Sequence, residues 1–332
     1  MNEKPSKDFY CPCQEADPDH FIINEEVKWL VDHQGEYQFS QKDYLRVYNC
    51  IHCNACGTTN ERFILKEKFL RDGNKIEGLK ATVKNLETHG TPFILNKSRV
   101  KHFEGISENS NTLLYMGCFT TVKTPKYAES IIEYLINKGI EFTILDQEIC
   151  CGYPILCNGA MDSYHNLVKK NKELFQNKGF KKIITVCPSC YLVFKKEFES
   201  ENIDVKFFIE YLEPSEQKKI GKLIIQHACP LRNGEIPEIV EKLEKIYKES
   251  GYTILENIPN RCCGGGIGHQ LRIDIINEIA LKRMDDFKIE NLDREEEAYI
   301  TTYCPDAYWI IKVFGRKKKI PFLLKDMCEL LR

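Results

Sequence analysis

Cys150-Cys151-Gly152 recurs further along the chain as Cys262-Cys263-Gly264, and each copy sits inside a longer pattern of cysteines. The first pattern, called here the first cysteine set, comprises Cys118, Cys150, Cys151, Cys187 and Cys190. The second cysteine set comprises Cys229, Cys262, Cys263 and Cys304, in the same order and at similar spacings. Ala307 stands where the repeat would place a cysteine equivalent to Cys190. Two cysteine patterns in the same order and at similar spacings indicate an internal duplication. Because the second copy lacks the last cysteine, we expect the two copies to have different roles.

Strand-like and helix-like segments alternate around both sets. Four short apolar or β-branched runs lead towards a cysteine of the sets: Thr112–Met116, Lys182–Val186, Lys222–Gln226 and Ala298–Thr302. Weaker strand-like runs occur at 141–145 and 252–255, and helical patterns at 127–137, 161–177, 236–249 and 267–287. This alternation predicts an α/β fold with parallel sheets, built as tandem Rossmann-like domains. The cysteines would then lie at the carboxyl edge of the strands, where open α/β sheets bind ligands.

Residues 1–110 have a different pattern from the strand–helix alternation of the rest of the chain. Helical patterns over 61–70 and 76–89 are each followed by a glycine, at Gly73 and Gly90. We therefore expect a mostly helical, ferredoxin-like region at 1–110, a first cysteine-rich domain at 111–220 and a second, degenerate one at 221–332.

Composition narrows the class of protein. The chain has 332 residues, 42% of them hydrophobic, and a net charge of −2. This balance gives no reason to expect nucleic acid or an anionic membrane as a partner. The start of the chain has no apolar signal core, and no apolar run is long enough to span a membrane, so we expect a soluble, cytoplasmic protein.

Sixteen cysteines in a reducing compartment need an explanation other than disulfides. Metal ligation is the main one. Two adjacent cysteines cannot easily coordinate a single tetrahedral zinc ion at good angles. In a multi-iron cluster, each sulfur can bind a different iron atom. We expect iron–sulfur clusters, with zinc as the alternative.

A further motif, Cys50-x-x-Cys53-x-x-Cys56, matches three of the four ligands of a bacterial ferredoxin run. The position of the usual fourth cysteine is Asn60. The fourth ligand is predicted to be Cys11, which precedes a proline, with Cys13 as the second choice; a zinc knuckle is the alternative.

With these residues in place, the chain resembles the CCG-domain family of iron–sulfur oxidoreductases, which includes the B and D subunits of heterodisulfide reductase. The resemblance covers about residues 112–332 and weakly the amino-terminal part. It implies that the five cysteines of the first set hold a noncubane [4Fe–4S] cluster that cleaves a disulfide. The four cysteines of the second set would hold a third cluster or zinc, or would be empty. Gly152, Gly264 and Gly265 would let backbone N–H groups approach the cofactor.

The resemblance also implies a mechanism. Electrons would enter through the amino-terminal cubane [4Fe–4S] cluster and reduce a small anionic disulfide at the first set, or flow in reverse. No nicotinamide or flavin motif follows a strand, so a flavoprotein or similar subunit would donate the electrons. The alternative is a non-catalytic subunit that relays electrons within a dehydrogenase or reductase complex.

Overall fold

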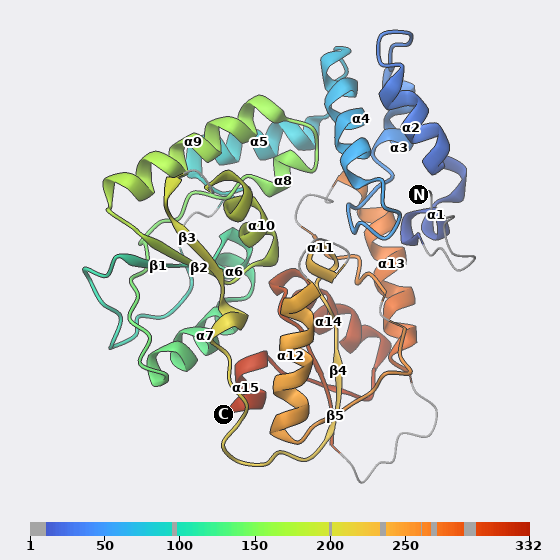
Figure 1. Ribbon diagram of the computed structural model, residues 1–332. Coiled ribbons are helices and arrows are strands. Elements are labelled where there is room, and N and C mark those ends of the chain that lie inside the picture. The colour runs from blue at the N-terminus through green and yellow to red at the C-terminus, as the bar shows by residue number, and fades with distance from the viewer. Residues whose placement is uncertain are drawn as a thin grey trace.

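The computed structural model describes residues 11–94, 98–198, 201–232, 237–259, 261–266, 271–288 and 297–332. Two parallel β-sheets, one in each half of the region after residue 110, carry the cysteine sets. Figure 1 shows the first sheet, the second sheet around β4 (Lys222–Ile225) and β5 (Thr253–Ile254), and the helices of residues 12–71 as three neighbouring groups, with α5 (Glu77–His89) beside the helices of the first sheet. The mixed α/β class with parallel sheets, predicted from the sequence, is confirmed.

The first sheet has the order β1-β2-β3, and all its strands are parallel. Its strands are β1 (Thr112–Tyr115), β2 (Lys182–Thr185) and β3 (Asp204–Phe207). A single parallel bridge between Leu113 and Thr143 places the chain around Thr143 along the other side of β1. All four residues of β1 are buried, because helices cover both faces of a parallel sheet.

The second sheet has the order β5-β4-β6-β7, again with parallel strands. Its strands are β4 (Lys222–Ile225), β5 (Thr253–Ile254), β6 (Ala298–Thr301) and β7 (Leu323–Leu324). If the bridge at Thr143 is counted, both sheets arrange their segments in the same spatial order. In each half the chain leaves the first strand towards one side and returns on the other side, so the connections diverge between β1 and β2 and between β4 and β6. Such divergence opens a crevice at the carboxyl ends of the two strands.

Helices surround both sheets. Those of the first half are α6 (Cys118–Lys123), α7 (Pro125–Asn137), α8 (Tyr153–Leu156), α9 (Met161–Asn177) and α10 (Pro188–Glu197), with a 3-10 turn at Phe208–Tyr211. Those of the second half are α11 (Cys229–Arg232), α12 (Pro237–Ser250), α13 (Ile273–Asp286), α14 (Pro305–Lys318) and α15 (Met327–Leu331). One apolar core runs from the first sheet to residues of β4 and α12, and joins the halves. A second core lies between β6, α13 and α14.

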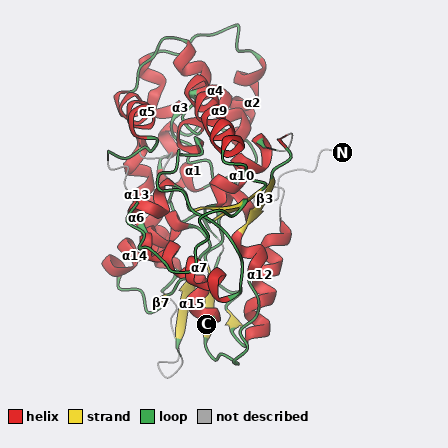
Figure 2. Ribbon diagram, turned by 90° about the vertical axis from the view of Figure 1, so that its left-hand side faces the viewer, coloured by secondary structure: helices red, strands yellow, loops and turns green. Residues whose placement is uncertain are grey.

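The amino-terminal region is helical and packs against both halves. Its helices are α1 (Pro12–Ala16), α2 (Asn24–Asp32), α3 (Tyr44–Val47), α4 (Thr59–Arg71) and α5 (Glu77–His89), with 3-10 turns at Pro18–His20 and Gln41–Asp43. Helix α1 contacts α13 of the second half, and α5 contacts α8 of the first. Arg272, just before α13, donates to Asp17 Oδ2 over 2.6 Å, and the Tyr44 hydroxyl donates to the carbonyl of Leu271 over 2.8 Å. Figure 2 shows α2, α3, α4 and α5 at one end of the molecule and α12, α15 and β7 at the other.

Most predicted elements are present, with two kinds of difference. The run at 141–145 forms only the bridge at Thr143, and β3 and β7 were not predicted. Two predicted helices include residues outside the described ranges. The helix predicted at 236–249, which corresponds to α12, includes residue 236, and the helix predicted at 267–287, which corresponds to α13, includes residues 267–270. None of the helices in the described part of the chain has both the length and the apolar character needed to cross a membrane.

Candidate metal centres

The first cysteine set gathers at the crevice of the first sheet. Cys118 begins α6 directly after β1, and Cys187 is the N-cap of α10 directly after β2. Cys190 lies one turn into α10, and the adjacent pair Cys150-Cys151 comes from the loop before α8. Separate segments of the first half therefore deliver five thiols to one place, as the sequence predicts.

The five thiols form a continuous set of contacts. The sulfur atoms of Cys118 and Cys150 lie 3.6 Å apart. Cys151 contacts Cys150 and Cys190, and Cys190 also contacts Cys187. All five residues are buried, and no cysteine of the described residues is paired in a disulfide. The donor set is therefore composed of sulfur alone, as iron–sulfur clusters require.

The protonation of these thiols is strongly interdependent. Hydrogen bonds from Cys118 and Cys151 hold the pKa of Cys150 well below its usual range. The same contacts, followed by burial, raise the pKa values of Cys118 and Cys151 well above theirs. Adjacent buried thiolates repel one another, so all five can ionise together only if a cation neutralises them. Iron would supply that charge.

The backbone at Gly117 is shaped around the sulfur atoms. Gly117 has φ of +88°, and a Cβ there would lie 3.2 Å from Cys190 Sγ. The buried carboxylate of Glu148 accepts hydrogen bonds from the N–H groups of Met116 and Gly117, each over 2.7 Å. Burial raises the pKa of Glu148 to about 7. Sequence reasoning missed Glu148; its place two residues before the cysteine pair was the available signal.

The amino-terminal cysteines form a second group, called here the amino-terminal quartet: Cys11, Cys13, Cys50 and Cys56. Cys11 contacts Cys13 and Cys56, and Cys13 contacts Cys50. The N–H of Ile51 also donates to Cys13 Sγ over 3.3 Å. Cys11 and Cys13, the first and second choices for the fourth ligand, thus both lie beside Cys50 or Cys56.

Two buried cations accompany this quartet, and neither was anticipated from the sequence. Arg62 and Lys66 lie on successive turns of α4, and Lys66 donates to the carbonyl of Cys50 over 3.1 Å. A hydrogen bond from Cys13, with the charges of Arg62 and Lys66, lowers the pKa of Cys50 to about 6. Burial opposes the charge of Arg62, but the thiolates of the quartet raise its pKa. These cations would offset the negative charge of four thiolates.

The second cysteine set repeats the geometry of the first. Cys229 begins α11 after β4, and Cys304 is the N-cap of α14 after β6. Cys262 contacts Cys229 and Cys263. The N–H of Gly264 donates to Cys262 Sγ over 3.4 Å, and that of Gly265 to Cys263 Sγ over 3.3 Å.

Both glycines after the second pair are closely packed. Gly264 has φ of +79°, and a Cβ there would meet the carbonyl oxygen of Ile276 at 2.8 Å. A Cβ at Gly265 would lie 3.2 Å from Cys263 Sγ. At Gly152 the N–H donates to Cys150 Sγ over 3.5 Å, so the predicted approach of backbone to sulfur is present in both halves.

A small cavity lies at the second set, and its lining includes residues from all three regions of the chain. Cysteines of this lining are Cys53, Cys229, Cys262, Cys263 and Cys304. Ala307 lines the same cavity, as do Tyr153, Pro188 and Ser189 of the first half. Burial raises the pKa of Cys304 well above its usual range, and the charges of Asp306 and Cys187 act in the same direction. The two sets are therefore neighbours across the start of α10.

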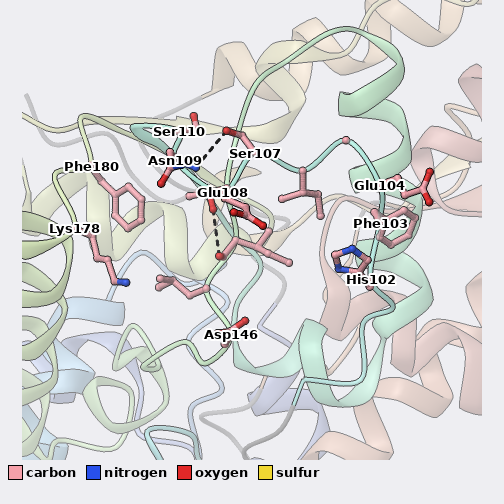
Figure 3. A pocket seen from close by; sticks show the side chains of 15 residues that line it. His102, Phe103, Glu104, Ser107, Glu108, Asn109, Ser110, Asp146, Lys178 and Phe180 are labelled. Carbon is pink, nitrogen blue, oxygen red and sulfur yellow. Dashed lines mark hydrogen bonds between the residues drawn. The ribbon is translucent and has the colours of Figure 1, made fainter.

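Two further observations bear on metal binding. Within the described residues, no group of three or more His, Cys, Asp or Glu side chains forms a ready-made site for one metal ion. A cavity of about 680 Å³ away from the cysteine sets has no cysteine in its lining; it lies beside the segment 102–110 and the chain at Thr143, with Lys178 and Phe180 at its edge (Figure 3).

Comparison with known proteins places the chain in a family. The model of the cysteine-rich (CCG) domain matches residues 112–195 and again 223–312, and together these segments cover more than half of the chain. This chain belongs to the cysteine-rich CCG-domain family.

The individual proteins compared with this chain have low sequence identity to it, at most 24% for those described here. An uncharacterised iron–sulfur protein of Methanococcus maripaludis is 23% identical over 94% of this chain and 68% of its own length. The D component of the dihydromethanophenazine:CoB–CoM heterodisulfide reductase of Methanosarcina acetivorans is 24% identical over 78% of this chain and 70% of its own length. A crystal structure of a hypothetical protein from Helicobacter pylori matches 92% of this chain and 66% of that one, with a TM-score of 0.59 and 12% identity, which is a likeness of fold. The chain thus spans about two thirds of the length of these proteins.

Proposed function

We propose that this chain is an iron–sulfur oxidoreductase subunit of the heterodisulfide reductase B/D type. The observation that carries the proposal is the first cysteine set: five buried thiols in a continuous chain of contacts beyond the carboxyl ends of β1 and β2. The names of its relatives, an iron–sulfur protein and a heterodisulfide reductase component, support the same class. The three regions, 1–110, 111–220 and 221–332, are proposed as a ferredoxin-like part and two Rossmann-like domains; the equal strand order of the sheets supports the duplication.

The site would perform a two-electron reaction. One disulfide, two electrons and two protons would give two thiols, or the reverse. A noncubane cluster at the first set would supply iron for the substrate sulfur, and a cubane cluster at the amino-terminal quartet would supply single electrons. The protein holds the thiols in place through the Glu148 carboxylate and the helix amino ends of α6 and α10, whose N–H groups favour negative charge.

A route for electrons is supported by the positions of the sets. Lys66 donates to the carbonyls of both Cys50 and Cys157, each over 3.1 Å, which links the amino-terminal quartet to the loop after α8. Tyr153, at the start of α8, lies against Cys157 and within the electrostatic reach of Cys187 and Cys50. The same contiguity favours the second candidate function, a subunit that only relays electrons. In either case we propose a flavoprotein or similar subunit as the electron donor.

The first test is the iron, zinc and acid-labile sulfide content of protein purified without oxygen. About eight irons would correspond to clusters at the first set and the quartet, and about twelve to a filled second set as well. Stoichiometric zinc with almost no iron would refute both redox functions and leave a zinc-stabilised interaction protein.

The second test separates catalysis from relay. Protein reduced with dithionite and methyl viologen is mixed with the CoB–CoM heterodisulfide or with glutathione disulfide, and thiol release is measured. We expect turnover of a disulfide that falls at least about a hundredfold in Cys151→Ser, with the matched control Cys328→Ser unchanged, since Cys328 is buried in the C-terminal helix α15 and belongs to neither set. Equal turnover by both variants would contradict disulfide chemistry at the first set.

A further inference from the structure

Cys53 is placed differently from its two neighbours in the amino-terminal motif. His52 and Asn54, on either side of it, both have positive φ, of 53° and 57°. Left-handed backbone is uncommon at residues other than glycine, and two such residues around one position turn the chain sharply. The thiol of Cys53 contacts Cys262, and Cys53 lines the cavity of the second cysteine set.

The amino-terminal quartet already contains four thiols without Cys53. Cys13 contacts both Cys11 and Cys50, and Cys11 contacts Cys56. A cubane [4Fe–4S] cluster takes four cysteine ligands, so the quartet has the number required. The ferredoxin-like spacing of the motif therefore does not decide which cluster each of its cysteines serves.

The second cysteine set has one thiol fewer than the first. All four of its cysteines lie in the second half, and Ala307 occupies the helix position that Cys190 occupies in the first half. Ala307 is 1% exposed and lines the same cavity as Cys53. Cys53 also belongs to an apolar cluster that contains Cys229 and Cys262 of the second set and Cys11 and Cys13 of the quartet, so it lies where these two groups of thiols meet.

We propose that Cys53 is the fifth ligand of the second cysteine set and that the cubane cluster is held by Cys11, Cys13, Cys50 and Cys56. The second site is then a five-thiol site with one ligand supplied from the amino-terminal region, in place of the one lost at position 307. This inference rests on the proposed function only in that a metal cluster fills the sites.

The assignment gives the second site the same number of thiols as the first. It also makes the loop 50–56 a direct bridge, because Cys50 and Cys53 would serve two different clusters within one turn of chain. The second site would then lie between the quartet and the first set, since its cavity is also lined by Pro188 and Ser189 of α10.

The experiment compares four full-length proteins purified without oxygen: wild type, Cys53→Ser, Cys50→Ser and the double variant Cys53→Ser with Ala307→Cys. Iron, zinc and sulfide are counted per chain, and the reduced proteins are compared by electron paramagnetic resonance and Mössbauer spectroscopy. In the double variant the new thiol lies three residues after Cys304 on α14, as Cys190 does after Cys187 on α10.

We expect Cys53→Ser to lose about four irons, or to keep them with an altered second-site spectrum, while the cubane signal that Cys50→Ser abolishes is retained. The double variant should regain the wild-type count and spectrum. The inference is overturned if Cys53→Ser and Cys50→Ser lose the same signal, if Cys53→Ser matches wild type in metal and spectra, or if Ala307→Cys restores nothing.

Failure of the proposed function has a different signature. Wild-type protein that holds zinc and almost no iron would refute the redox proposal. The ligand assignment would then be read from the zinc itself: supported if Cys53→Ser loses zinc that the double variant regains, and overturned if it does not.

Discussion

At the scale of single residues, the geometry of the first cysteine set depends on residues that are not cysteines. Gly117 turns the chain between β1 and α6 with a φ of +88°, and Glu148 accepts hydrogen bonds from the two N–H groups of that turn. Cys118, the next residue, is thereby held beside Cys150. A Cβ at position 117 would be in tight contact with Cys190 Sγ, at 3.2 Å, and the backbone there has a φ that L side chains rarely adopt.

We expect Gly117→Ala to lose most of the iron of the first site and its disulfide turnover. The new methyl group would lie 3.2 Å from Cys190 Sγ and 3.4 Å from Cys187 Cβ, in a conformation that alanine rarely adopts. The matched control is Gly139→Ala, which has a φ of +68° and nothing within 4 Å of the new Cβ. Thermal unfolding should show a similar destabilisation in both variants, because both place alanine at a positive φ. Iron content should fall only in Gly117→Ala, and equal metal content in the two variants would contradict this account.

Residue types and spacing predicted that the cysteines of each set lie close together, because one cysteine follows each of the strands β1, β2, β4 and β6, and strand order brings these ends together. That the two sets hold metal stays a prediction. The loop 50–56 could not be predicted in the same way. A spacing of three residues suits one cluster, but the positive φ values of His52 and Asn54 depend on contacts with the rest of the molecule. Arg62 and Lys66 were missed because a charge on a helix usually faces water.

At the scale of elements, the amino-terminal helices are fixed to α13. Arg272 donates to Asp17 over 2.6 Å, to the carbonyl of Leu45 over 2.9 Å and to Asp274 over 2.7 Å. The side chains of Arg272 and Asp17 are 5% and 16% exposed, so water screens this pair weakly. One residue thus ties the chain before α13 to two segments of the amino-terminal region.

We expect Arg272→Met to lower the free energy of unfolding by about 1–3 kcal/mol, since it removes the hydrogen bonds to Asp17 and to the carbonyl of Leu45 and leaves Asp17 paired with His20 alone. The control is Arg71→Met on α4, whose side chain is 59% exposed and whose pairing with Glu67 is worth about 0–1 kcal/mol. Denaturant unfolding measures both. A change for Arg272→Met no larger than that for Arg71→Met would show that the tie contributes little.

Element prediction succeeded where a pattern is long or strongly apolar, as in α9 and β2, and failed where it is short. The strand β7 has two residues, and β3 begins with an exposed aspartate and continues through a lysine, so neither carries a clear apolar run. The segment at 141–145 has the composition of a strand, but only Thr143 pairs with β1, through Leu113.

At the scale of the whole molecule, the three groups of thiols lie next to one another, since residues of all three proposed regions line the cavity at the second set. The apolar core that begins at the first sheet continues into β4 and α12, whereas the core of α2 and α4 is smaller and separate. The described part of the amino-terminal region has no sheet of its own. Its order should therefore depend on metal more than that of the two sheets.

We expect removal of iron by a chelator, under reducing and oxygen-free conditions, to raise amide hydrogen exchange first and most in residues 11–57. The strands β1 and β2 should stay protected, because buried parallel pairing holds them without metal. Mass spectrometry of peptides from the two regions, with and without metal, measures this. Uniform loss of protection across the chain would indicate one cooperative unit.

The tie between Asp17 and Arg272 joins residues that are 255 positions apart in the chain. During synthesis on a ribosome residues 11–57 precede α13, against which α1 packs. The tie can therefore form only after the chain before α13 has been synthesised. If the amino-terminal quartet holds a cluster, as proposed, its final surroundings would be complete only from that point of synthesis onwards.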